Sequence, residues 1–171
     1  MLLFYITSII TLKEIAMSIK SDKAKELFLK GYNCSQAVVG AFCEDLGLDF
    51  ETAIKLSSSF GGGMGRLREV CGTVSGIFLL VGLKFGYTDI QDKTAKINHY
   101  KLIQDIAERF RQKEGSIICR EILQIQKDQK ESYIPEDRTP EYYKTRPCVR
   151  LVETAALIAE EVLENNFYPQ N

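Results

Sequence analysis

The five cysteines have the most distinctive chemistry in this chain, because thiolates act as nucleophiles and as ligands of soft metals. No two of them have the Cys-x-x-Cys spacing and no Cys-x-x-Cys-His sequence occurs, which excludes a covalently attached c-type haem. Their odd number and wide spacing argue against a small secreted disulfide scaffold. Only one histidine is present, so a site that needs several imidazoles is also excluded. The cysteines are Cys34, Cys43, Cys71, Cys119 and Cys148.

Three of these cysteines stand where the sequence predicts the first turn of a helix. Cys34 follows Asn33, which is a good N-cap, Cys71 directly precedes an apolar run, and Cys148 follows Pro147. Free amide hydrogens and the positive end of a helix dipole stabilise a thiolate, so we expect lowered thiol pKa values and a tendency towards metal ligation or redox chemistry. Each of the three shares a helical face with apolar residues, so all three should point inward, where they could converge on one buried point.

Cys43 has a different expected environment. It lies nine residues after Cys34, which on one helix is about 14 Å along the axis and about half a turn around it. The two residues therefore cannot share one small site, and we interpret Cys43 as a packed apolar residue. Ordinary packing is the alternative for the other cysteines too, since free cysteine is among the most buried residue types.

A glycine-rich segment, Gly61-Gly62-Gly63-Met64-Gly65, precedes Cys71. It lacks the lysine and hydroxyl residue of a phosphate loop and follows no predicted strand, so we do not expect it to bind phosphate. We expect it to fold over a cofactor and donate amide hydrogens to sulfur, with Gly62 and Gly63 as backbone contacts. The alternative is a tight loop between packed helices. Gly72 should add a third contact, because it leaves room for a bulky inorganic group beside the thiol.

Charged and aromatic residues near these motifs have plainer interpretations. We interpret Arg66 and Arg68 as a solvated charged stretch, and the alternative is that they offset the negative charge of a thiolate cluster. The single histidine, His99, is expected at the edge of the core rather than as a ligand.

The elements that must position these residues are helices, because helical periodicity dominates the chain and strand alternation is almost absent. The fold class predicted is all-α, a single-domain helical bundle of about six helices. Gly31, Gly47 and Gly115 are expected to end helices, and Thr139 followed by Pro140 to begin a short one. The predicted helices cover residues 23–30, 34–46, 50–59, 72–85, 88–113 and 148–163, with a short one around Cys119.

The long helix near the middle of the chain is predicted in more detail. Thr88 or Asp89 should cap it, and it should continue to about Lys113. Its inward-facing residues are expected to be Ile97, Ile103, Ile106 and Phe110.

The chain of 171 residues is long enough for one domain with its own core, and its net charge of −1 gives no field that would attract nucleic acid or anionic lipid. Residues 2–12 are mostly apolar but too short to span a bilayer, and they lack the flanks of a secretory signal. We therefore expect a cytoplasmic protein with no nucleic-acid or membrane partner. Residues 1–20 are expected to form an N-terminal extension, which could be a non-native start, and 21–168 a helical four-cysteine domain. The alternative for the first residues is a weak signal or an interfacial anchor.

Several motifs, taken together and in order, resemble one family. They are YNCSQAV around Cys34, GGGMGRL, CGTVSG at Cys71, CRE at Cys119 and PCVRLVETAA at Cys148. This combination resembles the redox-active family named for its C–GCAxxG–C–C cysteine pattern, over about residues 22–163. The family's Cys-Gly-Ala-x-x-Gly element corresponds to residues 71–76, with Thr73 where alanine is usual.

The resemblance implies four functional cysteines, with Cys43 outside the set. It also implies a prosthetic group, and an iron–sulfur cluster is the suspected one. A similar cysteine domain occurs beside haem in the split-Soret type of cytochrome, but this chain has no haem attachment site. We therefore expect a redox-active protein that binds an iron–sulfur cluster or another metal, for electron transfer with an unidentified partner protein or as a redox accessory. The expected ligands are Cys34, Cys71, Cys119 and Cys148.

Two alternatives stay open. A dithiol/disulfide oxidoreductase or redox sensor would need no cofactor, and its exchanging pair would be Cys34 with Cys71 or Cys119 with Cys148. A structural zinc site or a plain helical interaction domain would be redox-silent. A homodimer is a further expectation, because the exposed half of a small helical bundle often pairs with a second copy, although no residue specifies one.

Overall fold

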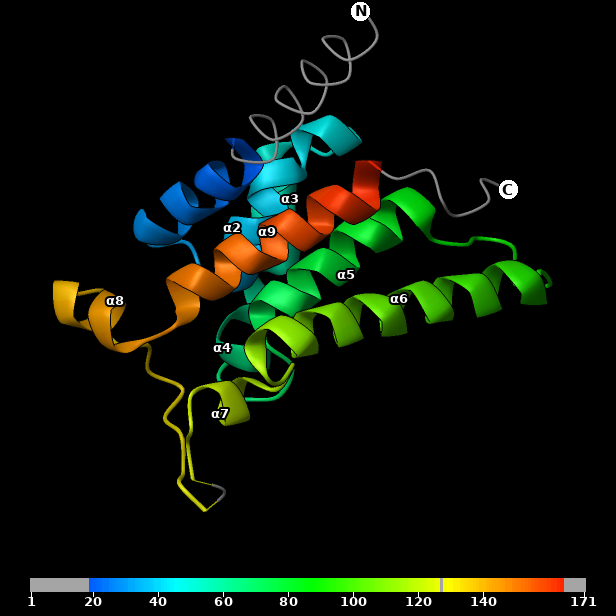
Figure 1. Cartoon of the computed structure of the whole chain (residues 1–171). Coiled ribbons are helices and arrows are strands. Elements are labelled where there is room, and N and C mark those ends of the chain that lie inside the picture. Colours follow the sequence, from blue (N-terminus) through cyan, green and yellow to red (C-terminus); the bar gives the residue numbers. More distant parts are fainter. Residues whose placement is uncertain (1–18, 127, 165–171) are drawn as a thin grey trace, which may run out of the picture.

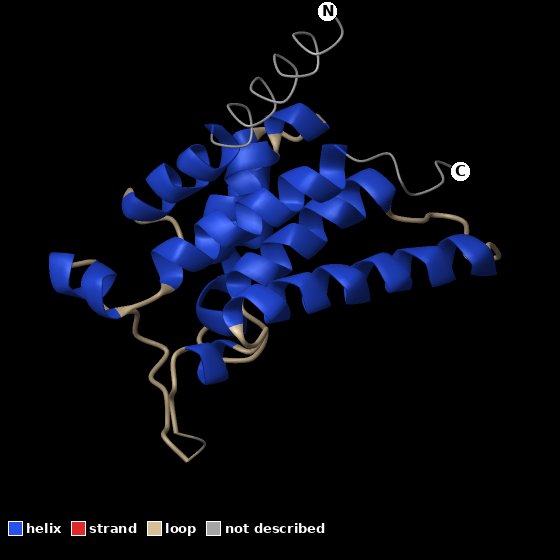
Figure 2. Ribbon diagram, viewed as in Figure 1, coloured by secondary structure: helices blue, strands red, loops and turns tan. Residues whose placement is uncertain are grey.

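A computed structural model describes residues 19–126 and 128–164 of the chain. Most of the predicted N-terminal extension, residues 1–18, and the end of the predicted domain, 165–168, lie outside the described residues. Within the described residues the protein is built from helices and contains no strand (Figure 2), and its one β-type pairing is an isolated antiparallel bridge between Val70 and Ile118. The predicted all-α fold is confirmed.

The helical elements follow the predicted order, with additional short turns. A first helix covers residues 19–29. It is followed by α2 (Cys34–Phe42), η1 (Glu44–Leu46), α3 (Phe50–Ser57), η2 (Ser58–Phe60), α4 (Gly61–Met64), α5 (Gly72–Phe85), α6 (Lys93–Glu114), α7 (Cys119–Ile122), α8 (Pro140–Thr145) and α9 (Cys148–Glu164).

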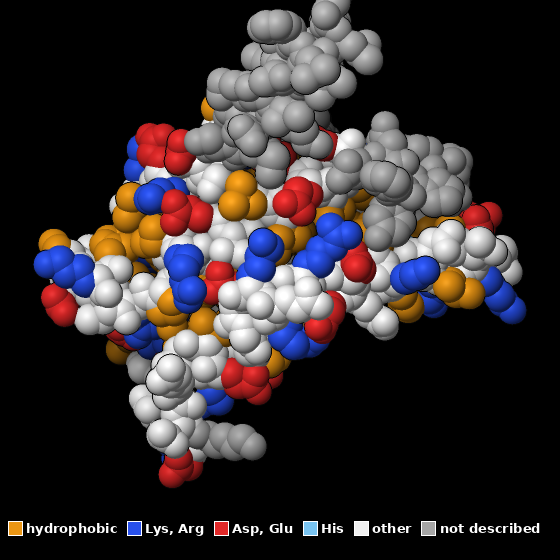
Figure 3. Space-filling view, viewed as in Figure 1, with side chains coloured by type: hydrophobic (Ala, Val, Ile, Leu, Met, Phe, Trp, Pro, Cys, Tyr) orange, Lys and Arg blue, Asp and Glu red, His pale blue; other side chains and the backbone are white. Residues whose placement is uncertain are grey.

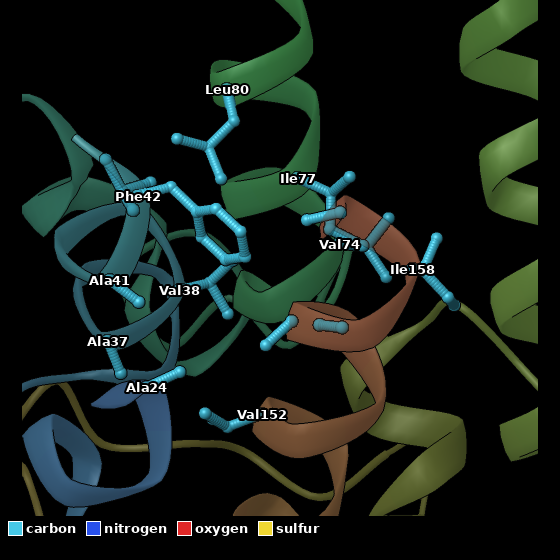
Figure 4. Packing of buried hydrophobic residues seen from close by; sticks show 14 of the residues in the cluster. Ala24, Ala37, Val38, Ala41, Phe42, Val74, Ile77, Leu80, Val152 and Ile158 are labelled. Atoms are coloured by element: carbon cyan, nitrogen blue, oxygen red, sulfur yellow. The ribbon is translucent and has the colours of Figure 1, made fainter. Parts of the chain in front are cut away.

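The apolar helix α5 lies at the centre of the fold, with α2 and α9 packed against it (Figure 1). Its sequence is apolar on nearly every side, which is typical of a helix buried all round. Figure 4 shows Phe42 of α2, Ile77 of α5 and Ile158 of α9 in the shared core. Each fully buried side chain of this size contributes about 1.5–3 kcal/mol relative to an exposed one. This core fixes the N-terminal ends of the three helices relative to one another.

The helix ends confirm most of the predicted caps. Asn33 and Gln36 form a capping box at the start of α2, and Thr139 caps α8. The predicted cap of the long helix was wrong. Asp89 accepts a hydrogen bond from the nearby Gln91 amide, and Asp92 caps α6 instead, accepting from Ala95 N at 2.9 Å. The helix therefore begins about one turn later than predicted.

The inward face predicted for α6 is only partly correct. Ile106 and Phe110 are buried, but Ile97 is 65% exposed. In Figure 1 the N-terminal end of α6 extends beyond the neighbouring helices, although Ala95 and Leu102 in this half of the helix are buried. The face of the molecule seen in Figure 3 has acidic and basic side chains interspersed among small apolar areas. No helix in the described ranges combines the length and the apolar character of a membrane span.

Candidate functional site

One pocket, at the N-terminal ends of α2, α5 and α9, is lined by four of the five cysteines. Cys34 and Cys148 are the first residues of α2 and α9, Cys71 is the N-cap of α5, and Cys119 begins α7. The cavity has a volume of about 50 Å³. Four segments that are distant in sequence therefore present thiols to one small space, which we call the cysteine pocket.

Backbone hydrogen bonds hold the segments that contain Cys71 and Cys119 side by side. Cys71 N donates to Ile117 O at 2.8 Å, and Cys119 N donates to Glu69 O at 2.7 Å. These bonds flank the Val70–Ile118 bridge and align the two segments antiparallel. The short helix α7 then starts at Cys119, as the sequence predicted.

Cys34 is fixed by the cap that precedes it. The Asn33 side chain accepts hydrogen bonds from Ser35 N and Gln36 N, and its Nδ2 donates to Ser58 O at 2.9 Å. The first turn of α2 is thereby tied to η2. A Cβ on Gly72 would lie 2.5 Å from Cys34 Sγ, so only glycine allows the start of α5 to approach this sulfur.

The glycine segment also lies against the pocket. A Cβ on Gly63 would lie 2.6 Å from Cys119 Cβ, and Gly62 lines the cavity. Their φ angles of +70° and +65° make α4 an irregular turn, which agrees with the predicted tight loop more than with a regular helix. Gly62, Gly63 and Gly72 therefore all lie at the pocket, and amide donation to sulfur stays a prediction.

The thiol pKa values differ from those predicted at helix starts. Burial raises the pKa of Cys71, and the neighbouring Cys34 raises it further. Burial and the nearby Cys34 raise the pKa of Cys148 to about 12. The pKa of Cys119 is also raised, by burial and by Cys34, although Arg68 opposes this. The prediction of lowered values for Cys71 and Cys148 was wrong, because loss of hydration and mutual repulsion exceed the helix dipole.

Arg68 is the residue whose environment the sequence misjudged most. Its side chain is 3% exposed, whereas a solvated position was predicted. Its Nη1 lies 4.0 Å from Cys119 Sγ, and its Nε donates to Glu131 Oε2 at 2.7 Å. Its backbone is left-handed, with φ +64°, which costs a non-glycine residue on the order of 1 kcal/mol or more. The alternative reading, a cation that offsets charge on sulfur, fits this position.

Two acidic residues join the 124–139 segment to the arginines of the pocket. Glu131 pairs with Arg68, and Glu136 pairs with Arg146 at 2.5 Å. In Figure 1 this segment leaves α7, extends away from the bundle and returns to α8. No sequence motif marked it, because the ion pairs connect residues more than sixty positions apart in the case of Arg68 and Glu131.

Two further residues complete the surroundings. Thr73, which replaces the usual alanine, is fully buried and its Oγ1 lies 3.2 Å from Cys71 Sγ. Cys43 is fully buried outside the pocket, and its thiol donates to Gly40 O at 3.5 Å. The interpretation of Cys43 as a packed residue is confirmed.

The residues that line the pocket fit a prosthetic group that is held through cysteine sulfur. Four thiols line the cavity, and the glycine at position 72 clears the space beside Cys34. A single tetrahedral metal ion needs sulfurs about 4 Å apart. Among the described residues, no group of three or more histidine, cysteine or acidic residues is close enough to hold a metal ion.

The comparison with protein families gives one match. The model of a family described as "Putative redox-active protein (C_GCAxxG_C_C)" matches residues 32–162, which include all four pocket cysteines. No curated protein and no solved structure matches the chain.

Proposed function

Because the chain belongs to the C_GCAxxG_C_C family of redox-active proteins, we propose that its pocket cysteines bind an iron–sulfur cluster and that it serves in electron transfer or as a redox accessory. One observation carries this proposal: four cysteines from four separate segments line a single pocket. The fifth cysteine is packed elsewhere, so the convergence is selective. The proposed ligands are Cys34, Cys71, Cys119 and Cys148.

The chain's own residues would give such a group a nearly dry and partly cationic environment. Cys71 and Cys119 are buried, and Cys34 and Cys148 are half-buried. Arg68 would offset negative charge beside Cys119, and the Thr73 hydroxyl would donate a hydrogen bond to Cys71 sulfur. A cluster bound here would accept and release one electron, with a potential that depends on burial and on hydrogen bonds to sulfur.

The raised thiol pKa values agree with a pocket whose cysteines lose their protons only when a metal binds. Without a metal, thiolates in one buried space would repel one another, so Cys71, Cys119 and Cys148 should be protonated at neutral pH. A metal would displace these protons, and its binding would become tighter as the pH rises.

Anaerobic expression with iron and sulfide analysis tests the proposal. We expect visible absorption and stoichiometric iron and sulfide in the wild-type protein. Serine replacement of each pocket cysteine should lower the iron content, whereas Cys43→Ser should retain it, since Cys43 lies outside the pocket. Wild-type protein that binds zinc alone, or no metal, under these conditions would contradict the proposal.

Thiol–disulfide exchange is the second candidate, and the partial exposure of Cys34 and Cys148 favours it. A solvent-accessible thiol is needed to react with an external disulfide. This function predicts a colourless protein in which two thiols are oxidised and reduced reversibly. Mass spectrometry after alkylation, under defined thiol buffers, would identify the pair.

The cellular setting belongs to the same proposal. We place the protein in the cytoplasm, where thiols stay reduced, with a redox partner protein rather than nucleic acid or membrane. A homodimer stays a prediction, which size-exclusion chromatography with light scattering would test.

A further inference from the structure

Three arginines line the cysteine pocket, and one of them differs from the other two. Arg68 pairs with Glu131, and Arg146 pairs with Glu136. Arg138 forms no ion pair within residues 19–126 and 128–164. The pocket therefore has one guanidinium whose charge no neighbouring carboxylate balances.

Arg138 is held in a fixed position by aromatic rings. Its Cζ lies 4.5 Å from the ring centre of Phe28, 4.9 Å from that of Tyr142 and 5.9 Å from that of Tyr143. Its Nη2 donates to Tyr32 O at 3.4 Å. Cation–π contacts of this kind orient a guanidinium without neutralising its charge.

The other terminal nitrogen of Arg138 has unused hydrogen-bonding capacity. Nη1 is buried and has no hydrogen-bond partner among the described residues. Burying a donor of a charged group without a hydrogen-bond partner is unfavourable. Arg138 also lines the pocket, so an acceptor bound there would complete the hydrogen bonding of its guanidinium.

The rest of the pocket also favours an anion. The N-terminal ends of α2, α5 and α9 meet there, and each presents the positive end of a helix dipole. Glu131 and Glu136 already pair with Arg66, Arg68 and Arg146, so neither carboxylate balances the charge of Arg138.

We propose that Arg138 forms a binding site for a compact oxyanion within the cysteine pocket, beside the thiols. The guanidinium would donate to one or two anionic oxygens through Nη1, and the cavity of about 50 Å³ limits the ligand to a few heavy atoms. Oxygen-terminated anions of this size include tetrahedral ions and short carboxylates. The proposal concerns the metal-free pocket, because a metal group held by the same cysteines would compete with the oxyanion for this cavity.

Calorimetric titration of the reduced, metal-free full-length protein with sodium phosphate, sodium sulfate and sodium acetate tests the proposal, with sodium chloride at equal ionic strength as the baseline. We expect saturable binding of at least one oxyanion, and the acetate arm separates carboxylate from tetrahedral ligands. Arg138→Gln should weaken binding roughly tenfold to a hundredfold. Arg138→Lys should lose less, because it keeps the charge. The exposed Arg111 on α6 gives a matched control, and Arg111→Gln should bind as the wild type does.

Several outcomes would overturn the site. They are absence of saturable binding above the chloride baseline, equal affinity in Arg138→Gln, and equal loss in Arg111→Gln. Loss of iron loading in Arg138→Gln without any oxyanion binding to the wild type would assign Arg138 to the metal–thiolate group instead. Circular dichroism of each variant checks the fold, and Arg138→Lys provides a second folded variant if Arg138→Gln is unstable. Failure of iron binding would leave these titrations unchanged, so the two proposals can fail separately.

Discussion

Cys34 and Gly72 are in such close contact that a methyl group on Gly72 would lie 2.5 Å from the Cys34 sulfur and 2.6 Å from Phe60 O. The contact joins the start of α2 to the start of α5. One of these atoms is a carbonyl oxygen of the backbone, so the clash cannot be relieved by a side-chain rotation alone. The spacing between Cys34 and Cys71 therefore depends on the absence of a Cβ atom at Gly72.

Gly72→Ala should lower the free energy of unfolding by about 1–3 kcal/mol, as overpacking does, and should reduce iron loading by displacing Cys34. Urea denaturation and iron analysis measure the two effects. Gly82 in the same helix is the matched control, since a Cβ there meets nothing within 4 Å. Gly82→Ala should be neutral or stabilising by up to about 1 kcal/mol, and equal behaviour of the two variants would refute the packing argument.

Glu131→Gln should destabilise the protein by about 3 kcal/mol, because it leaves the buried Arg68 guanidinium with only Glu136, 4.0 Å away, as a counter-charge. Thermal or urea unfolding measures the change. Glu51→Gln removes one partner of an ion pair whose side chains are 75% and 78% exposed, so it should change stability by no more than about 0.5 kcal/mol. A similar small effect in both variants would show that Arg68 is not dependent on Glu131.

The stability of the reduced, metal-free protein should fall as the pH rises above about 8.5, the ordinary thiol pKa. The folded state holds the Cys148 proton up to a pKa of about 12, whereas the unfolded chain releases it earlier. This contribution is complete below pH 8.5 and is lost progressively towards pH 12. Urea unfolding at several pH values measures the slope, which Cys148→Ser should reduce. A slope that does not change in this variant would contradict the assignment.

The order of alkylation in the native protein should follow burial. Cys34 and Cys148 are half-buried, and the other three thiols are buried. Iodoacetamide should therefore modify Cys34 or Cys148 before Cys43, Cys71 and Cys119, which peptide mass spectrometry can follow with time. All five should react at similar rates in denaturant. Early modification of Cys43 in native conditions would be inconsistent with its packed position.

Thr73→Ala should make Cys71 harder to ionise, because the threonine hydroxyl lowers the pKa of this thiol while burial raises it. Thr73→Ser keeps the hydroxyl and should resemble the wild type. Ultraviolet absorbance of the thiolate during a pH titration measures the difference. In protein that contains a cluster, the loss of the same hydrogen bond should lower the reduction potential. Equal titration of both variants would show that the hydroxyl does not act on sulfur.

The sequence predicted local features well and distant partners poorly. The caps at Asn33 and Thr139 depend on residues within one turn, and both were confirmed. The start of α6 was wrong because Asp89 and Asp92 can both accept a backbone hydrogen bond, and local sequence does not rank them.

The same limit applies to the candidate site. Helical phase indicated that Cys34 and Cys148 point inward, but phase cannot show that their helices meet at one pocket. The burial of Arg68 depends on Glu131, which lies 63 positions away, and no local pattern announces such a pair. The thiol pKa values were predicted in the wrong direction for a similar reason. The effect of the helix dipole can be inferred from local sequence, whereas desolvation, which raises these pKa values, depends on tertiary packing.

The positions of the pocket cysteines along the chain, from residue 34 to residue 148, have a consequence for the lifetime of the protein. Any occupant or bond that joins these sulfurs ties the beginning of the helical core to its last helix, and it binds the native state alone. Chain whose pocket is empty and whose thiols are not joined would unfold more often and become a better substrate for proteases. The rate at which the protein is degraded in the cell would then depend on whether its pocket cysteines are joined.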